Sequence, residues 1–288
     1  MLYLAIVSLI WAFSFGLIGS ALSGVDPFFV ATVRLGCATI LFLPFFRPKL
    51  IWGINSFRLF TYGAIQFGLM YVCYMKSYEY LPSHLVALFS IMTPVYVVLI
   101  NDIRKRQFSY RYLLAAILSV CGAATIKAKG MPSGDIWLGF ILMQIAGLSF
   151  AFGQVAYRDW KQSHASINHT AVFSILTFGG TVFAGSFSLF FVDQASLTIN
   201  AGQWQSIFYL GFFASGLGFF LWNKGAVLCN PGTLAAFNNA VVPLAVFFSL
   251  FIFGEVGVLS VEDLIRLTIG GTLIAFAVAI TSNKKISI

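Results

Sequence analysis

The sequence carries very little charge: only 9% of its 288 residues are Asp, Glu, Lys or Arg. A soluble domain has about 25% charged residues, so the composition excludes an ordinary water-soluble protein. Hydrophobic residues make up 59% of the chain, and the mean hydropathy is +0.91. A membrane helix needs about 20 apolar residues. Stretches of that length without any charged residue include 1–25, 80–101, 136–157, 194–223 and 225–254.

Cysteine and histidine are also scarce, which argues against metal and redox chemistry. His164 and His169 have only one carboxylate, Asp159, near them in sequence. Cysteines without CxxC spacing in apolar runs are typical of apolar packing. We therefore expect no metal, no cofactor and no membrane-embedded enzyme, which would need a cluster of catalytic groups. The four cysteines are Cys37, Cys73, Cys121 and Cys229.

Apolar runs alternate with short polar connections along the whole chain. Barrel strands need only about 10 residues and alternate in polarity, so the longer runs indicate helices. No Lys or Arg precedes the first run, so we expect it to be a retained span and not a cleaved signal peptide. The sequence predicts an all-α polytopic membrane protein with ten spans, near 2–22, 27–46, 57–79, 83–101, 110–128, 135–157, 168–192, 203–228, 232–253 and 262–282.

Basic residues are distributed unevenly between the two sides of these spans. With a cytoplasmic N-terminus, only Lys127, Lys129 and Arg266 lie outside. Basic residues concentrate on the cytoplasmic side, so both termini are predicted to be cytoplasmic, in the inner membrane of a bacterial cell. Topology and lipid contact then account for the net charge of +8 without a nucleic-acid partner. The inside residues are Arg47, Lys49, Arg58, Arg104, Lys105, Arg106, Arg111, Arg158, Lys161, Lys284 and Lys285.

The chain contains an internal repeat. Adding 149 maps Pro82 onto Pro231 and Pro94 onto Pro243. Each copy has five predicted spans, an odd number, so the second copy must be inverted relative to the first. Inverted repeats with a site at their interface are a transporter architecture. We predict one five-helix repeat in 1–129 and a second, inverted one in 130–288. A step of 148 maps a further set of residues, Gly63, Gly68 and Lys76, onto Gly211, Gly216 and Lys224.

Several motifs carry a resemblance to a known family. Trp11 in IWAFSF is similar to a tryptophan-containing first helix, although AF replaces the usual Gly-Ser, and Arg34 in ATVRLG is similar to an arginine early in the second helix. LPSHLVALFSIMTPV and NPGTLAAFNNAVVPL resemble paired proline-containing fourth and ninth helices, and FIFGE ends in the expected Glu255. Together the motifs resemble the ten-span EamA-type members of the drug/metabolite transporter superfamily. The resemblance covers essentially the whole chain and implies a carrier of small metabolites.

The two paired prolines predict kinks beside a binding cavity. Proline lacks an amide hydrogen and leaves the carbonyl of residue i−4 unpaired. Pro94 would free the carbonyl of Ser90, and Pro243 that of Asn239. A free carbonyl inside the membrane should face protein or a wet cavity. We assign both prolines as hinges and predict that neighbouring polar groups bind substrate: Ser90, Thr93, Asn238 and Asn239. The alternative is that the asparagines bond a neighbouring helix.

Other polar groups inside the predicted spans extend this site. Gln66, Met70 and Tyr74 recur at i, i+4 and i+8, so they should share one helix face. We add as substrate-binding candidates Ser14, Gln144, Gln154 and Trp222, together with Ser215 on the same predicted helix as Trp222. Trp222, Tyr71 and Tyr78 have an alternative role as interfacial belt residues.

Arg34 is an ionisable residue within a span, which is by default a functional hypothesis. Three roles are open: snorkelling outward, pairing with a carboxylate such as Glu79, or contacting substrate. No Asp or Glu falls at mid-span, where a proton-coupled antiporter usually needs one. This favours facilitated diffusion or exchange over proton coupling through His84.

The sequence thus predicts a carrier that works by alternating access in the lipid bilayer. Amides, hydroxyls and aromatic rings suit a small polar metabolite, such as an amino acid or similar zwitterion, moving outward. The second interpretation is import or exchange of a larger cofactor-like, nucleotide or sugar-phosphate solute. A pore is less consistent with the inverted repeat. The oligomeric state is a monomer or a homodimer, because Gly122, Gly270 and Gly271 suit packing either between the halves or between copies.

Overall fold

The computed structural model describes residues 1–47, 49, 53–81, 86, 89–127, 136–192, 197–251 and 261–282. Helix is the only regular secondary structure in these residues, which confirms the predicted all-α class. The first half contains α1 (Leu2–Ala21), α2 (Pro27–Phe42), η1 (Leu43–Phe45), α3 (Ile54–Gly63), η3 (Ala64–Leu69), α4 (Met70–Ser77), η4 (Ser90–Met92), α6 (Thr93–Lys105) and α7 (Tyr110–Lys127). The second half contains α8 (Ile136–Ser163), α9 (His169–Phe191), α10 (Ala201–Tyr209), η5 (Leu210–Leu217), α11 (Gly218–Val227), α12 (Pro231–Phe251) and α13 (Val261–Ser282).

The surface of the bundle is that of a membrane protein. Trp137, Leu189 and Phe190 are 75%, 76% and 83% exposed, and large apolar side chains of this kind are suited to lipid contact. The chain is therefore a polytopic membrane protein, while the count of ten spans and the cytoplasmic placement of both termini stay predictions. Five helices among the described residues are long and apolar enough to cross a bilayer, namely Leu2–Ala21, Pro27–Phe45, Ile136–Ser163, His169–Phe191 and Ala201–Val227.

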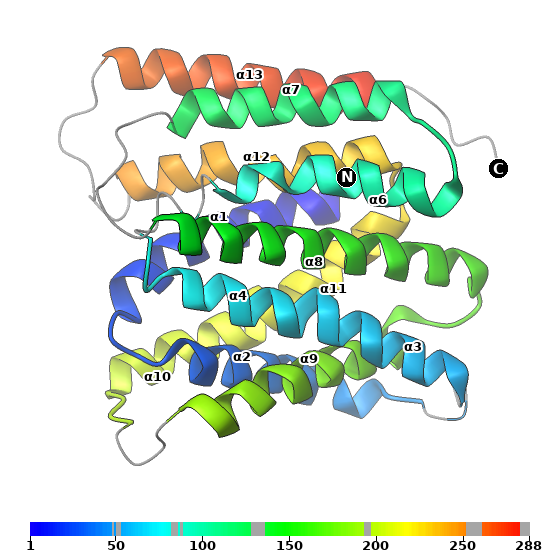
Figure 1. Cartoon of the computed structure of the whole chain (residues 1–288), viewed down its shortest axis with the longest axis vertical. Helices are drawn as coiled ribbons and strands as arrows, with labels where there is room; N and C mark the ends of the chain where they lie inside the picture. Colours follow the sequence, from blue (N-terminus) through cyan, green and yellow to red (C-terminus); the bar gives the residue numbers. More distant parts are fainter. Residues whose placement is uncertain are drawn as a thin grey trace.

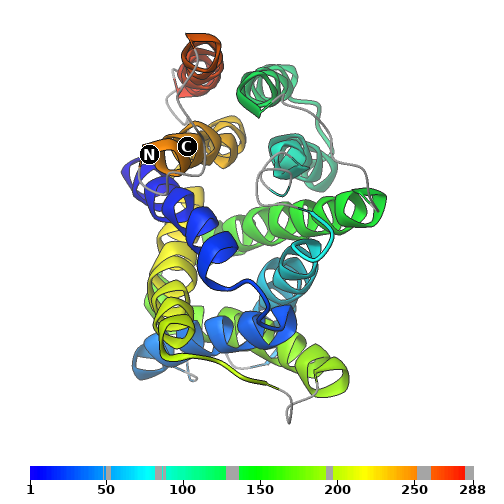
Figure 2. The ribbon, with the colours of Figure 1, turned by 90° about the vertical axis from the view of Figure 1, so that its left-hand side faces the viewer.

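The helices run side by side along one direction (Figures 1 and 2). The ends of α6 and α8 and the start of α3 lie together at the right of Figure 1. These segments carry Arg104, Lys105 and Lys161, so we call this the basic end. The clustering agrees with the charge asymmetry from which the cytoplasmic face was predicted.

Side-chain caps explain where two of the helices begin. The Asp26 carboxylate accepts hydrogen bonds from the amides of Phe28 and Phe29 at 2.8 and 2.9 Å, at the start of α2. At the start of α12, the Asn230 side-chain oxygen accepts from the Thr233 amide at 2.8 Å. Asparagine and aspartate are favoured caps, and proline suits the first helical position. Asn230 and Pro231 therefore define the start of α12, one residue before the predicted span of 232–253.

Both halves contain a π-helical segment within a longer continuous helix, η3 between α3 and α4 and η5 between α10 and α11. The first, η3, covers 64–69, and the second, η5, covers 210–217. Adding 148 to the first range gives 212–217, so the two segments match under the repeat found in the sequence. A π turn bonds i to i+5, and such turns are frequent at functional sites. Here each π turn shifts the helical register near the middle of the bundle.

Glycines allow the closest helix contacts. A Cβ on Gly122 would lie 2.7 Å from the Gly270 carbonyl oxygen, so α7 and α13 approach closely at this point. These two helices run next to each other at the top of Figure 1. Nothing lies within 4 Å of a Cβ on Gly271. Two roles were predicted for these glycines, packing between the halves and contact between copies. Gly122 and Gly270 pack the two halves against each other.

Candidate functional site

A cavity of about 140 Å³ lies among α1, α2, α4, η4, α6, α8, α11 and α12, so both halves line it. One water needs about 10–15 Å³ by this measure, so the space suits a small organic molecule. Its lining is mainly apolar, with Trp11, Phe15, Ile18, Met70, Met143, Ala146, Gly147, Phe150, Phe219 and Val241. The polar lining consists of Ser14, Arg34, Tyr71, Tyr74, Ser90, Thr93 and Asn238.

Arg34 is the charged group of this cavity lining. It is only 2% exposed, so it does not snorkel to the surface. Its Nη2 donates to the Tyr71 hydroxyl at 2.6 Å, and its Nε donates to the Ser215 hydroxyl at 3.2 Å. The guanidinium carbon also lies 4.7 Å from the centre of the Tyr71 ring. Glu79 pairs with Lys76 at 2.6 Å and makes no ion pair with Arg34.

Arg34 has no ion pair with any carboxylate in the part of the chain that the structure describes. A buried charge is costly unless it is paired and hydrogen-bonded. Tyr71 and Ser215 supply hydrogen bonds but no negative charge, and they hydrogen-bond each other at 2.9 Å. The arrangement leaves a positive charge at the edge of an apolar cavity. We call Arg34, Tyr71 and Ser215 the cation pole.

A second polar group of the lining lies on α6 and α12. The Asn238 amide nitrogen donates to the Leu234 carbonyl of its own helix at 2.8 Å. The Thr93 hydroxyl donates to the Ser90 carbonyl at 2.7 Å. This bond satisfies the carbonyl that Pro94 was predicted to free. Because both side chains use a donor on backbone, their oxygens remain as acceptors beside the cavity.

Five predicted site residues are placed outside the cavity lining, where their polar atoms bond other helices. Gln66 and Asn223 are paired at 2.9 Å, and Gln154 accepts from the Trp222 indole at 2.9 Å. Trp222 is fully buried, as is Tyr71 at 3% exposure, so neither is an interfacial belt residue. The five are Gln66, Gln144, Gln154, Trp222 and Asn239.

The other two of these five residues join the halves elsewhere. Gln144 accepts from the Tyr96 hydroxyl at 2.8 Å. Asn239 donates to the Ile91 carbonyl at 3.1 Å and to Ser119 at 3.4 Å. The alternative that asparagine bonds a neighbouring helix therefore describes Asn239, whereas its neighbour Asn238 lines the cavity.

The π turn explains why Gln66 departs from its expected face. On a regular α-helix, Gln66, Met70 and Tyr74 would lie in one row. Gln66 instead lies inside η3, where the i to i+5 geometry rotates it away from the other two. Met70 and Tyr74 line the cavity, while a Cβ on Gly153 would lie 2.0 Å from the Gln66 Cβ.

The two predicted hinges differ in what can be described. Pro94 stands at the first turn of α6, directly after the 3₁₀ segment η4. The fourth predicted span is thus interrupted at this proline. α12 continues through position 243, but the side chain of Pro243 and all of His84 lie outside the described residues. Hinge motion at both prolines stays a prediction.

Successive layers close the cavity toward the basic end. Phe150, Gln154 and Arg158 follow one another at four-residue spacing along α8 and share one face. At the first layer, the Trp11 ring packs 4.8 Å from Trp222 and 5.7 Å from Phe150. The second layer holds the Gln154–Trp222 hydrogen bond. Buried side chains, among them Trp222, Gln154 and Arg158, therefore fill the bundle between the cavity and this end.

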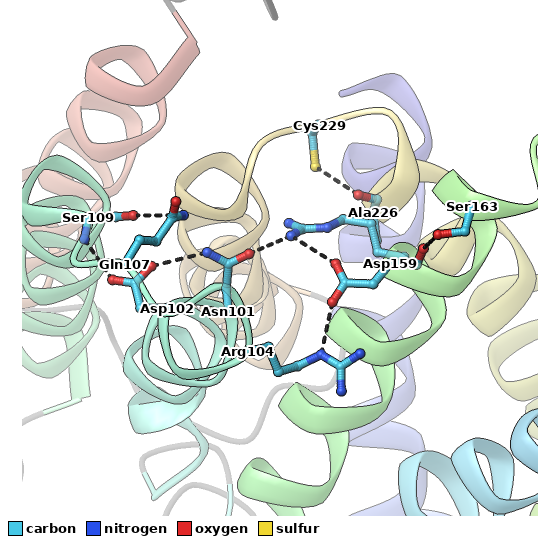
Figure 3. A network of polar contacts seen from close by, with 10 residues as sticks. Asn101, Asp102, Arg104, Gln107, Ser109, Asp159, Ser163, Ala226 and Cys229 are labelled. Atoms are coloured by element: carbon cyan, nitrogen blue, oxygen red, sulfur yellow. Dashed lines mark hydrogen bonds and ion pairs between the residues drawn. The ribbon is translucent and has the colours of Figure 1, made fainter. Parts of the chain in front are cut away.

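The third layer is a polar network at the basic end (Figure 3). Asp159 binds Arg104 of α6 at 2.8 Å and lies 3.6 Å from Arg158. Arg158 is 1% exposed and donates to the Asn101 side chain at 2.6 Å. Two of its nitrogens, Nε and Nη1, have no hydrogen-bond partner among the described residues. We call Asn101, Arg104, Arg158 and Asp159 the basic-end latch, because it ties α6 to α8.

Asp159→Asn is expected to loosen this latch and to speed maleimide labelling of Cys229 about tenfold. Cys229 lies beside this network (Figure 3) and is buried. Burial raises the pKa of its thiol to about 11. Because maleimide reacts with the thiolate, the intact latch protects Cys229 from labelling. Asp159 pairs with both Arg104 and Arg158, so losing its charge removes roughly 1–2 kcal/mol, and about 1.4 kcal/mol is tenfold.

The labelling is measured on purified protein in which Cys37, Cys73 and Cys121 are replaced by serine. Glu79→Gln, at the other end of the bundle, is the matched control and should leave the rate unchanged. An unchanged rate in folded Asp159→Asn protein would contradict the latch.

Sequence reasoning missed several residues of these networks. The sequence suggests only a belt role for Tyr71, although the cation pole depends on its hydroxyl. A sixth span that ends at 157 leaves Arg158 as a cytoplasmic charge only. α8 continues to Ser163, and the signal was the lack of any helix breaker between Arg158 and that residue.

A bundle of apolar helices around a largely apolar cavity that both halves line is the architecture expected of a membrane transporter. The sequence model of the EamA-like transporter family matches twice, over residues 1–127 and 133–283. The chain belongs to this family and is a transporter, integral to the bacterial inner membrane.

Similar proteins agree with this assignment. A Pseudomonas aeruginosa protein described as "Probable biotin transporter" is 37% identical over 281 residues, which cover 95% of this chain and 94% of that protein. The "Biotin transporter" of Salmonella typhimurium is 34% identical over 260 residues, 88% of this chain and 85% of that protein. A solved crystal structure with 14% identity has a TM-score of 0.77 and covers 97% of this chain and 96% of that one. This last likeness concerns the fold alone.

Proposed function

We propose that this transporter carries a small solute with one carboxylate and a large apolar part, and that biotin is such a solute. The observation that carries the proposal is Arg34, a buried cation without a carboxylate partner among the described residues, at the edge of an apolar cavity. A solute carboxylate would supply the missing counter-charge. Arginine is well suited to this role because its planar fork binds a carboxylate with two hydrogen bonds.

The composition of the cavity favours this solute over a zwitterion. Trp11, Phe150 and Phe219 offer apolar rings to an acyl chain. The lining contains no Asp or Glu among the described residues, so the ammonium group of an amino acid would meet Arg34 without a counter-charge. The names of the relatives point in the same direction. Both lines of support favour the cofactor-like interpretation over amino-acid export.

The proposal is tested by counterflow in proteoliposomes. Vesicles with the purified chain are loaded with unlabelled biotin, and entry of external radiolabelled biotin is followed. We expect transient accumulation that saturates with biotin and is competed poorly by biotinamide, which lacks the carboxylate. Empty liposomes are the control.

The same assay separates the alternatives. Saturable counterflow of amino acids without biotin counterflow would overturn the proposal in favour of the zwitterion interpretation. Flux of biotin without counterflow or saturation would indicate a pore instead of alternating access.

A further inference from the structure

The cavity has two chemically different poles on opposite sides. α2 carries Arg34, and α12 carries Asn238. In Figures 1 and 2, these two helices lie on opposite sides of α1. Both residues nevertheless line the same cavity. A solute that spans it meets a cation at one end and neutral polar groups at the other.

The neutral end is specialised by how its hydrogen-bond donors are used. Asn238 uses one of its two amide N–H groups on the Leu234 carbonyl at 2.8 Å, and its side-chain oxygen bonds no described residue. Thr93 commits its only hydroxyl proton to the Ser90 carbonyl at 2.7 Å. The hydroxyl oxygen of Thr93 keeps acceptor capacity. We call Thr93 and Asn238 the acceptor pole.

We propose that the acceptor pole accepts hydrogen bonds from N–H groups at the end of the solute opposite its carboxylate. Asn238 is then the residue that makes the transporter specific for solutes with such N–H groups. The inference rests on the proposed function, because it assigns the orientation of the same solute in the same cavity. A cyclic urea presents two N–H donors and matches two acceptors. A ring of carbon and sulfur alone presents none, and leaves the Asn238 oxygen without a partner.

The acceptor pole distinguishes two solutes by whether they satisfy its hydrogen-bond acceptors, and not by their size. A site built to hydrogen-bond a solute rejects the analogue that lacks the donor, because its own polar group is then left unpaired. Apolar walls between the poles recognise both solutes alike. The acceptor pole therefore decides between acids of similar length, while the cation pole decides between an acid and its amide.

The test uses three probes in competition with radiolabelled biotin: unlabelled biotin, lipoate and biotinamide. Lipoate has the same acid chain but a ring without N–H donors, and biotinamide has the ring without the carboxylate. Asn238→Leu should reduce the preference for biotin over lipoate about tenfold. Its preference for biotin over biotinamide should stay as in the unmodified chain.

Asn239→Leu is the matched control, because Asn239 is the next residue, bonds Ile91 and does not line the cavity. It should lower the melting temperature while leaving both preferences unchanged. Thr93→Val removes the second acceptor at similar volume and gives an independent measurement if Asn238→Leu fails to fold; a smaller loss of preference in the same direction is expected.

Two results overturn the inference, and they are distinguishable. Biotin counterflow by the unmodified chain together with an unchanged biotin-to-lipoate preference in folded Asn238→Leu, or in Thr93→Val, refutes the acceptor pole alone. Absence of biotin counterflow by the unmodified chain refutes the proposed function and the inference together.

Discussion

Arg34→Gln is expected to lower biotin counterflow at subsaturating biotin by about 30-fold or more. The guanidinium is 2% exposed, so a carboxylate that reaches it forms a desolvated charge pair. Truncating one partner of such a pair costs roughly 2–5 kcal/mol, and each 1.4 kcal/mol or so is tenfold. The measurement is the initial rate in proteoliposomes, normalised to the amount of folded protein.

Two variants make the interpretation specific to the position and shape of the charge. Arg34→Lys keeps the charge but loses the planar fork, so an intermediate rate is expected. Lys76→Gln removes a cation that pairs with Glu79 at 2.6 Å and does not line the cavity, so its rate should stay within about twofold. Folded Arg34→Gln protein that transports biotin normally would show that the cation pole does not bind the solute.

Local chemistry made much of the fold predictable from the sequence. Charge-free runs identify the apolar helices, and the Asn230-Pro231 start of α12 follows from the preference of asparagine for caps and of proline for the first turn. The repeat also predicts equivalent positions, and the π segments at 64–69 and 210–217 conform to it. The segments themselves were not predicted, since no residue pattern distinguishes a π turn from the α-helix around it.

The candidate site was predictable only in part, because the sequence does not give the rotation of each helix. Ser14, Arg34, Met70, Tyr74, Ser90, Thr93 and Asn238 do line the cavity. A polar residue inside a span must find a partner, but the sequence does not say whether that partner is a solute or another helix. Gln66 and Gln154 find theirs in Asn223 and Trp222. Those choices depend on helix rotation, which the π turn at 64–69 changes.

Arg34 shows how structure decides between roles that sequence leaves open. Snorkelling, pairing and substrate contact were all compatible with its position in the second span. Burial excludes the first, and the Lys76–Glu79 ion pair removes the carboxylate that was the candidate for the second. What supports the third role is that the Arg34 guanidinium hydrogen-bonds neutral groups only, so its charge has no counter-charge among the described residues.

Helix packing is set by glycine at several contacts, and the contact of α3 with α9 is the closest. A Cβ on Gly63 would lie 1.8 Å from the Leu176 carbonyl oxygen, and one on Gly179 would lie 2.1 Å from the Phe60 carbonyl oxygen. Both neighbouring atoms belong to the backbone, so they cannot move away as the end of a flexible side chain can. The two helices therefore touch backbone to backbone.

Gly63→Ala is accordingly expected to destabilise the fold by about 3 kcal/mol, the upper end for overpacking, and to lower the melting temperature by roughly 6–12 °C. Intrinsic tryptophan fluorescence of the detergent-purified protein reports the transition.

Gly36→Ala and Gly271→Ala are matched controls, because nothing lies within 4 Å of a Cβ at either position. Alanine favours helix over glycine by about 1 kcal/mol, so both controls should melt at or above the original temperature. If Gly63→Ala melts with the controls, α3 and α9 do not meet at this glycine; if it alone melts early, α3 and α9 meet in a backbone contact that only glycine permits.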